Sequence, residues 1–563
     1  MILDDFQHEP QIAYFSMEIA LRDDIGTYAG GLGVLAGDTV RSAADLDVPM
    51  VAVTLVSRMG YFRQEIDADG RQIERNDVWD PDKLTQPLGA KIALRIEGRE
   101  VWVRSWLYTV QGLRGHRRPV ILLDTDVDEN RGEDREITHR LYGGDEAYRL
   151  KQEIVLGIGG VRMLRALGFR IRQYHLNEGH SALLALELLR RLARSTQEAG
   201  TGAVYDIPRV RELCNFTSHT PVEAAHDQFG YDLVERILGD FVARKALESL
   251  AGPGSLNMTR LALNLSEYVN GVGRRHAEVS ERSFPGYRIH AIANGVHPSA
   301  WTCAALAQLY DTCLPGWRHE PELLIRIDQV ADDALWQAHL TAKRALVARV
   351  QATTGIAFNP ELPILAFARR MTAYKRPDLL FYDLERLKSI ARKQPFQLVV
   401  AGKAHPADAS GKQLIETLHR HARELAGVIP MAFLPNYGMT QALHVVSGAD
   451  VWLNTPLPPL EASGTSGMKA AFNGVPSLSV LDGWWIEGCI EGNTGWAIGN
   501  DGQSSEREDA VALYDKLETK VLPLYGAGPQ AWITVMRGAI GKNASYFNSH
   551  RMMRRYATEA YIR

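Results

Sequence analysis

The chain has 563 residues, of which 45% are hydrophobic and 23% charged, as in an ordinary soluble globular enzyme. One hydrophobic core stops growing at about 250–300 residues, so this length predicts two domains. The formal net charge of −4 provides no basic field for nucleic acid or for an anionic membrane, so an anion site has to be built locally.

The predicted elements of the first half are irregularly spaced. "IAYFSMEIAL" (12–21), "PMVAVTLV" (49–56) and "IRQYHLN" (171–177) are typical of strands. "LKQEIVLGIGGVRMLRALG" (150–168) and "SALLALELLRRLA" (181–193) are typical of helices. These segments predict a doubly wound α/β domain.

The second half alternates regularly between apolar strands and amphipathic helices. "ILAFA" (364–368) precedes the predicted helix "RPDLLFYDLERLKSIARK" (376–393), with Pro377 at its start. "FQLVVAG" (396–402) precedes a helix over 411–427. Short apolar strands between helices predict a parallel sheet covered on both faces. The fold we expect is α/β with two Rossmann-like domains facing a cleft, residues 1–293 and 294–563, with a last helix that returns to the first domain.

Four scattered cysteines, Cys214, Cys303, Cys313 and Cys489, form no C-x-x-C pair. This pattern favours a reducing compartment without a disulfide framework. The start, "MILDDFQHEP", lacks the regions of a signal peptide, and no run of about 18 apolar residues occurs. We therefore expect a cytoplasmic protein.

Two segments are candidates for anion binding. In "GTYAGGLGVLAGD" (26–38) the glycines allow close backbone approach just before a predicted helix, although a tight turn explains them equally well. In "FARRMTAYKRPD" (367–378), Arg369, Arg370 and Lys375 follow a predicted strand, where ligands of such sheets bind. Their position favours a phosphate clamp over a solvated helix face.

Lys469 lies in "EASGTSGMKAAFNG" (461–474), between small residues and an apolar stretch. The preceding backbone N–H groups suit a phosphate, and a lysine in an apolar pocket suits Schiff-base chemistry, although a snorkelling lysine remains the alternative. His219 ("SHTPVE"), and Glu178 and His180 ("LNEGHSA"), also follow predicted strands. No spacing of these residues indicates a metal.

These segments together resemble the α-glucan phosphorylases, the family of glycogen, starch and maltodextrin phosphorylases. "EASGTSGMK" is similar to the pyridoxal phosphate signature of that family. The resemblance covers nearly the whole chain through "AYFSMEIA", "AGGLGVLAGD", "RLKQE", "LNEGHSA", "SHTPVE", "VNGVGRRHAEV", "ANGVHPSAW", "FARRMTAYKR", "VVAGKAHP" and "LPNYGM". It implies the two-domain GT-B fold and pyridoxal 5′-phosphate as cofactor.

The resemblance also implies roles for individual residues. Lys469 would bind pyridoxal phosphate covalently, and Arg370 and Lys375 would bind the substrate phosphate with the backbone of Gly31. His219 would contact the glucosyl unit, chiefly through its backbone carbonyl. The remaining cofactor residues would be Arg369, Thr465, Ser466, Gly467, Tyr14, Trp301 and Tyr437, and the remaining substrate residues Leu32, Asn294, Glu461, Ser463 and Gly464. The catalytic residues would be Lys469, Arg370, Lys375, His219 and Glu461.

The implied reaction is phosphorolysis of an α-1,4-glucan by inorganic phosphate, which gives α-D-glucose 1-phosphate with retention. The cofactor phosphate would act as proton donor or electrostatic partner. Relatives are often homodimers, so a dimer is a further expectation. Because the chain begins almost at "AYFSMEIA", we expect no control through an N-terminal extension. The acidic gating loop of long relatives has no clear match near Gly143–Asp145, and "MTAY" lacks a histidine of those relatives.

Two other functions remain open. A glycogen or starch synthase of the same fold would use a nucleotide-sugar donor, but it has no use for Lys469 in "GTSGMK". A catalytically silent glucan-binding protein needs no phosphate clamp, which argues against it given Arg370 and Lys375. An enzyme of the aminotransferase kind is disfavoured because nothing else resembles that fold.

Overall fold

The computed structural model describes residues 3–7, 11–193, 204–221, 226–500 and 504–562. Contacts divide the chain into two units, each described by itself below. Unit 1 comprises Met1–Phe62, Asn76–Ile292 and Met553–Arg563, and unit 2 comprises Arg63–Arg75 and Ala293–Met552. This division departs from a single cut after residue 293, because a hairpin and the C-terminal segment each group with the unit encoded by the other half of the chain.

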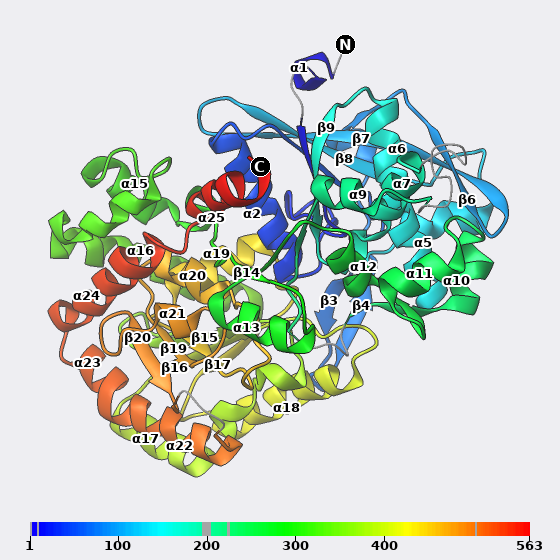
Figure 1. The fold of residues 1–563 in the computed structure, drawn as a ribbon. Coiled ribbons are helices and arrows are strands. Elements are labelled where there is room, and N and C mark those ends of the chain that lie inside the picture. Colours follow the sequence, from blue (N-terminus) through cyan, green and yellow to red (C-terminus); the bar gives the residue numbers. More distant parts are fainter. Residues whose placement is uncertain (1–2, 8–10, 194–203, 222–225, 501–503, 563) are drawn as a thin grey trace. The chain divides into compact units, whose positions relative to one another are not determined.

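Unit 1 is built on a mixed sheet, with strand order β14-β13-β10-β9-β1-β2-β8-β7-β5 and β6 paired to β7 in the described residues (Figure 1). The strands from β14 to β8 pair in parallel, and β7 runs antiparallel to β8. The order reverses between β1 and β9, which makes their carboxyl ends the expected ligand site. The bounds are β1 Gln11–Phe15, β2 Met50–Leu55, β5 Gln86–Pro87, β6 Ile92–Ile96, β7 Arg99–Gln111, β8 Arg117–Asp124, β9 Ile171–Asn177, β10 Cys214–Thr217, β13 Tyr268–Gly271 and β14 His290–Ala291.

The helices of unit 1 cover an apolar core that includes Phe15, Val53, Ile121, Leu176 and Phe216. The predicted helix over 150–168 is confirmed as α5 and α6, joined by a π-helical turn over Val155–Gly159. The helix bounds are α1 Asp4–Gln7, α2 Gly31–Asp45, α3 Pro81–Leu84, α4 Gly132–Arg135, α5 Glu146–Ile154, α6 Gly160–Ala166, α7 Leu183–Arg191, α9 Ile207–Leu213, α10 Tyr231–Leu238, α11 Arg244–Ala251, α12 Met258–Asn264 and α13 Arg274–Ser283; the short strands β11 Gln228–Gly230 and β12 Ser255–Asn257 form a hairpin.

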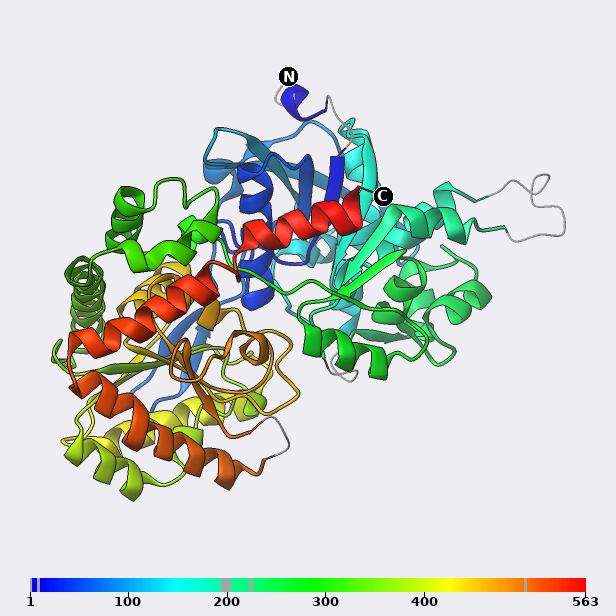
Figure 2. The ribbon, with the colours of Figure 1, turned by 60° about the vertical axis from the view of Figure 1, so that its left-hand side comes forward.

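Unit 2 contains a wholly parallel sheet of order β17-β16-β15-β18-β19-β20. Figures 1 and 2 show helices on both faces, with α17, α18 and α22 along one side and α16, α19 and α20 along the other. The predicted covered parallel sheet is therefore confirmed. The strands are β15 Ile364–Ala368, β16 Gln397–Ala401, β17 Met431–Leu434, β18 Val451–Asn454, β19 Ser477–Val480 and β20 Gly495–Ile498. The helices are α14 Pro298–Trp301, α15 Ala304–Cys313, α16 Asp332–Thr354, α17 Leu384–Lys393, α18 Ala409–Leu425, α19 Met439–Gly448, α20 Ser466–Phe472, α21 Trp485–Gly488, α22 Glu506–Lys516, α23 Leu522–Gly526 and α24 Pro529–Gly538, and α25 Ser549–Tyr556 follows.

The predicted helix over 376–393 is wrong in its first part. α17 begins at Leu384, where Asp383 caps it by accepting the N–H of Arg386, and Leu379–Phe381 forms a 3₁₀ turn. Arg376 has a φ of 44°, which interrupts any helix there. Pro377 is therefore not the first residue of that helix. The predicted strand over 12–21 is also shorter, because β1 ends at Phe15.

The hairpin of β3 (Arg63–Ile66) and β4 (Gln72–Arg75) packs on unit 2 through glutamine side chains. Gln64 donates to Gly402 O at 2.9 Å, and Gln72 donates to Ala404 O at 2.9 Å. In unit 1, the C-terminal Tyr561 hydroxyl contacts His175 Nδ1 at 2.6 Å. All four cysteines are free, and no described helix is long and apolar enough to cross a membrane.

Candidate functional site

The strand order of unit 2 reverses between β15 and β18, so the loops after these two strands meet at one edge of the sheet. Arg369 and Arg370 directly follow β15, as the sequence predicts, and Glu461 lies in the loop after β18. The sheet thus brings together two segments about 90 residues apart. The backbone N–H of Arg369 donates to Ala401 O at 3.0 Å, which holds the end of β15 against β16.

A carboxylate lies between two of the predicted cations. Arg369 Nη2 contacts Glu461 Oε2 at 2.5 Å, and Lys375 Nζ contacts the same oxygen. Burial alone would raise the pKa of Glu461, but Arg369 and Lys375 outweigh it and lower that pKa to about 2. Burial and the charge of Arg369 lower the pKa of Lys375 to about 7, against the pull of Glu461. The cluster therefore contains an ionised carboxylate and a lysine that titrates near neutral pH.

Arg370 is exposed at the edge of this cluster, unlike Arg369. Its charge also lowers the pKa of Lys375, so it lies near enough to act on that group. Lys375 Nζ lies 4.4 Å from the ring centroid of Tyr374, whose pKa burial raises to about 12. The three predicted cations therefore form one positively charged group around Glu461.

Asp482 supports Glu461 from the end of β19. Its Oδ2 accepts the backbone N–H of Glu461 at 2.9 Å, and Trp484 donates its backbone N–H to Ser463 O at 2.8 Å. A Cβ on Gly483 would lie 2.5 Å from Ser463 O, so the loop requires glycine there. Asp482 is not among the site residues predicted from the sequence. An aspartate directly after an apolar strand at this sheet edge was the available signal.

Lys469 lies on α20, in the apolar surroundings that the sequence predicts. It is 7% exposed, and its Nζ lies 3.9 Å from the ring centroid of Trp301. Asn473 ties the end of α20 to the segment of Trp301, because its Nδ2 donates to Trp301 O at 2.7 Å. At the start of α20, a Cβ on Gly467 would lie 2.6 Å from the Trp484 ring, so packing requires this glycine.

Three candidate site residues of unit 2 each have a buried polar atom without a hydrogen-bond partner in the part of the chain that the structure describes. These atoms are Arg369 Nη1, Ser463 Oγ and Asn294 Oδ1. Desolvated polar atoms of this kind are costly unless a ligand or water satisfies them. Tyr437 follows β17, and its pKa is raised by burial and held back by nearby Arg369. Gly464 has a φ of 80°, and Thr465 and Ser466 begin α20, where Ser466 Oγ accepts the Trp452 indole N–H at 3.1 Å.

In unit 1, Gly31 and Leu32 begin α2 directly after the glycine turn. Glu18 Oε2 accepts the N–H groups of Ala29 at 2.6 Å and Gly30 at 3.0 Å. A Cβ on Gly33 would lie 2.6 Å from that oxygen, whereas one on Gly31 would meet nothing within 4 Å. The glycines therefore have different roles. Gly33 makes room for Glu18, and Gly31 leaves the helix start exposed.

His219 follows β10 in unit 1. Its Nε2 contacts Asn177 Oδ1 at 2.6 Å, and its backbone N–H donates to Glu178 Oε2 at 2.7 Å. Burial lowers the pKa of His219 to about 3, so the ring is neutral at pH 7.

Tyr14 is 2% exposed on β1 and packs edge-on against His175. Asp145 caps α5 by accepting the N–H of Tyr148 at 2.9 Å.

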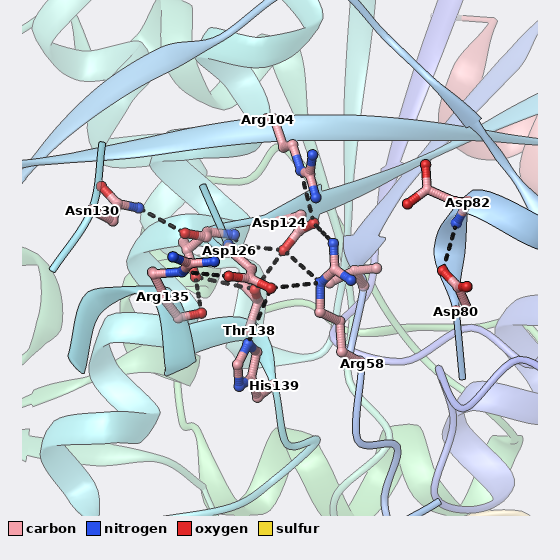
Figure 3. A network of polar contacts seen from close by, with 12 residues as sticks. Arg58, Asp80, Asp82, Arg104, Asp124, Asp126, Asn130, Arg135, Thr138 and His139 are labelled. Atoms are coloured by element: carbon pink, nitrogen blue, oxygen red, sulfur yellow. Dashed lines mark hydrogen bonds and ion pairs between the residues drawn. The ribbon is translucent and has the colours of Figure 1, made fainter. Parts of the chain in front are cut away.

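A second polar network in unit 1 surrounds Asp124 at the end of β8 (Figure 3). Asp124 accepts hydrogen bonds from Arg58 at 2.6 Å, Arg104 at 3.1 Å and the Trp106 indole at 2.8 Å. Arg58 is the largest influence that lowers the pKa of Asp124 against burial. Because arginines compensate this carboxylate, the network is best explained as a brace between β7 and β8.

A cationic cluster at the topological switch point of the parallel sheet of unit 2 is the arrangement expected of a site for an anionic ligand. The comparisons give a narrower result. The family model for carbohydrate phosphorylase matches residues 243–495. A maltodextrin phosphorylase of Thermococcus litoralis is 37% identical, over 98% of this chain and 70% of the relative. Glycogen phosphorylases of Aquifex aeolicus and Mycobacterium tuberculosis are 35% and 36% identical over 98% of this chain, and the matches cover 86% and 70% of those proteins. The chain belongs to the carbohydrate phosphorylase family.

Proposed function

We propose that the protein is an α-1,4-glucan phosphorylase, which transfers the terminal glucosyl unit of maltodextrin or glycogen to inorganic phosphate. The observation that carries this proposal is the group of Arg369, Arg370 and Lys375 around Glu461. Glu461 itself lies in the loop that leads to α20, which carries buried Lys469. A glucan-binding protein without activity has no need for a cationic cluster of this kind. The names of the relatives support the same reaction.

Pyridoxal 5′-phosphate is the cofactor that these residues fit. Lys469 would hold it, with Trp301 against the lysine and Tyr437 near Arg369. The partnerless Nη1 of Arg369 is suited to a phosphate oxygen, together with the backbone of Thr465, Ser466 and Gly467. When bound, this cofactor supplies a phosphate group that acts as proton donor or electrostatic partner beside the substrate phosphate.

The remaining residues orient the two substrates. Arg370 and Lys375, with the N–H of Gly31, would bind inorganic phosphate. Asn294, Glu461, Ser463 and Gly464, with Leu32 and His219, would hold the glucosyl hydroxyls. The substrate phosphate gives its proton to the glycosidic oxygen as the C1–O bond breaks, and its oxygen then bonds C1 from the same face. The fixed cations stabilise the charge that develops, as preorganised electrostatics requires.

This assignment needs both units, and we propose that they form the two halves of a GT-B fold around one cleft. The support is that each unit contains parallel strands with a topological switch point, and that candidate residues of each unit lie at or after the carboxyl ends of these parallel strands. Tyr14 would join the cofactor pocket from unit 1. A cytoplasmic homodimer remains a prediction from the resemblance.

The test is release of glucose 1-phosphate from maltodextrin by the purified protein, with and without inorganic phosphate. Phosphate-dependent release is the expected result. Absence of release from a protein with bound cofactor would point to a different sugar or acceptor. Absence of both release and cofactor would favour a synthase with a nucleotide-sugar donor.

A further inference from the structure

Glu178 in "LNEGHSA" has no role in the proposed reaction, although it follows β9 at the switch point of unit 1. It is 5% exposed and accepts three hydrogen bonds. Oε2 accepts the His219 backbone N–H at 2.7 Å and the Thr220 hydroxyl at 3.1 Å, and Oε1 accepts the Gly179 N–H at 3.2 Å. One buried carboxylate therefore joins the end of β9 to the loop after β10.

The backbone of Glu178 is also unusual. Its φ is 71°, a region that residues other than glycine rarely adopt. Such a conformation persists when the surrounding structure holds it, and it is frequent at functional sites. The Glu178 N–H donates to Thr217 O at 2.9 Å, so backbone and side chain both tie this residue to the β10 segment.

The ring and the backbone of His219 are held by different residues. The neutral ring donates through Nε2 to Asn177 Oδ1 at 2.6 Å, and Asn177 Nδ2 donates to Ser16 Oγ at 3.0 Å. The backbone is held by Glu178. A change at Glu178 therefore acts on the backbone of His219 without removing a contact of its ring.

We propose that Glu178 is a positioning residue of the glucosyl subsite, because its carboxylate holds the backbone of His219, whose carbonyl would contact the sugar in the proposed reaction. This inference rests on the proposed function. A purely structural role would lower only the stability of the protein. A positioning role predicts in addition that the folded variant binds the glucan more weakly.

The test uses Glu178→Gln in the full chain. The carboxamide keeps the shape but replaces one acceptor oxygen with a donor, so the three N–H and O–H groups cannot all be satisfied. Thr220→Val removes one hydrogen bond and is the milder variant should Glu178→Gln fail to fold. The control is Glu187→Gln, because Glu187 is also buried in unit 1 but pairs with Arg162 and Arg191.

Maltoheptaose binding by isothermal titration calorimetry is measured beside the KM for maltodextrin and for phosphate. We expect Glu178→Gln to weaken maltoheptaose binding and raise the maltodextrin KM about 10-fold, with the phosphate KM within about two-fold, and Thr220→Val to show a smaller change in the same direction. Glu187→Gln should lower the melting temperature without weakening binding. Equal glucan affinity in wild type, Glu178→Gln and Thr220→Val would overturn the inference. Binding is measured apart from turnover. Glucan binding without glucose 1-phosphate release would therefore refute the proposed reaction, while the binding data would still show whether Glu178 positions the glucan site.

Discussion

Arg369 donates through Nη2 to Oε2 of Glu461 at 2.5 Å, and Lys375 contacts the same oxygen. A single carboxylate of this chain thus pairs with two of the cations that we propose for phosphate binding, and the pair of cations keeps a net positive charge. Asp482, which accepts the N–H of Glu461 at 2.9 Å, fixes the backbone of that carboxylate. In the proposed reaction, the phosphate and sugar subsites would therefore share Glu461.

Glu461→Gln tests this shared position. Removal of the negative charge should tighten binding of inorganic phosphate alone by about 10-fold in acidic buffer, where Lys375 keeps its proton without the pull of Glu461, because an anion next to the cations is lost. Turnover should fall at least about 100-fold, since the sugar loses a charged acceptor. Calorimetric titration with phosphate and a turnover assay measure the two effects. Glu385→Gln, an exposed partner of Lys388, serves as control. Weaker phosphate binding by Glu461→Gln would contradict the arrangement.

The pH dependence of phosphate binding should report Lys375. Because its pKa is lowered to about 7, the lysine is charged below that pH and loses its proton as the pH rises through it. Phosphate affinity should therefore fall as the pH rises from 6 to 8.5. Arginine stays charged throughout this range, so Lys375→Arg should show a smaller decline. The ionisation of phosphate itself is common to both proteins and cancels in the comparison. Identical slopes would exclude Lys375 as the titrating group.

Lys469→Ala should yield protein without the visible absorbance of pyridoxal phosphate and without activity. The reason is that Lys469 Nζ, 3.9 Å from the Trp301 ring centroid, is the proposed attachment point. Absorbance spectra and phosphate analysis of the purified protein measure the cofactor. Lys393→Ala, at an exposed position of α17, should retain it. A Lys469→Ala protein with both absorbance and activity would refute the cofactor assignment.

Asp450→Asn should destabilise unit 2. Lys343 Nζ lies 2.7 Å from Asp450 Oδ2, and both side chains are fully buried. A lysine left without its counter-charge costs about 3–5 kcal/mol. The pKa of Asp450 is lowered in the folded state, so its stabilising effect is present above the unfolded pKa and is lost as the pH falls through the folded one. Thermal unfolding from pH 7 downward measures this. Asp515→Asn, which affects an exposed pair with Arg386, should change stability by less than about 0.5 kcal/mol.

Gly402→Ala should disturb the cationic cluster by displacing the backbone of Arg369. Gly402 has a φ of 150°, and a Cβ there would lie 1.8 Å from Arg369 O. Gly427 has a φ of 82° but a Cβ would meet nothing within 4 Å. Gly427→Ala should therefore cost about 1–2 kcal/mol from backbone strain alone. Gly402→Ala should cost a further 1–3 kcal/mol or so from overpacking and should weaken phosphate binding. Equal melting temperatures of the two variants would contradict this prediction, because they would show that the backbone of Arg369 moves away from Gly402 at little cost in stability.

The strands of unit 2, and the cations after the first of them, could be predicted from the amino-acid pattern alone. Short apolar runs such as Ile364–Ala368 have no alternative to burial, and a polar residue directly after such a strand lies at the sheet edge. The predicted start of the helix that became α17 is wrong because Arg376 adopts a φ of 44°. Its side chain donates to Thr455 O and Asp509, which are distant in the sequence, and helix propensity does not take such contacts into account.

Which side chains contact each other depends on the order of the strands and could not be predicted from the sequence. Glu461 contacts Arg369 because parallel pairing of β15 with β18 brings the two strand ends to one edge, and no local pattern encodes that pairing. The same holds for Glu178 and His219, which parallel pairing of β9 with β10 brings together. Strands, and the polar residues that follow them, can be predicted from the sequence because the apolar pattern reflects local burial. Partners distant in the chain follow from the order of strands in the sheet, because that order is set by packing of the whole unit.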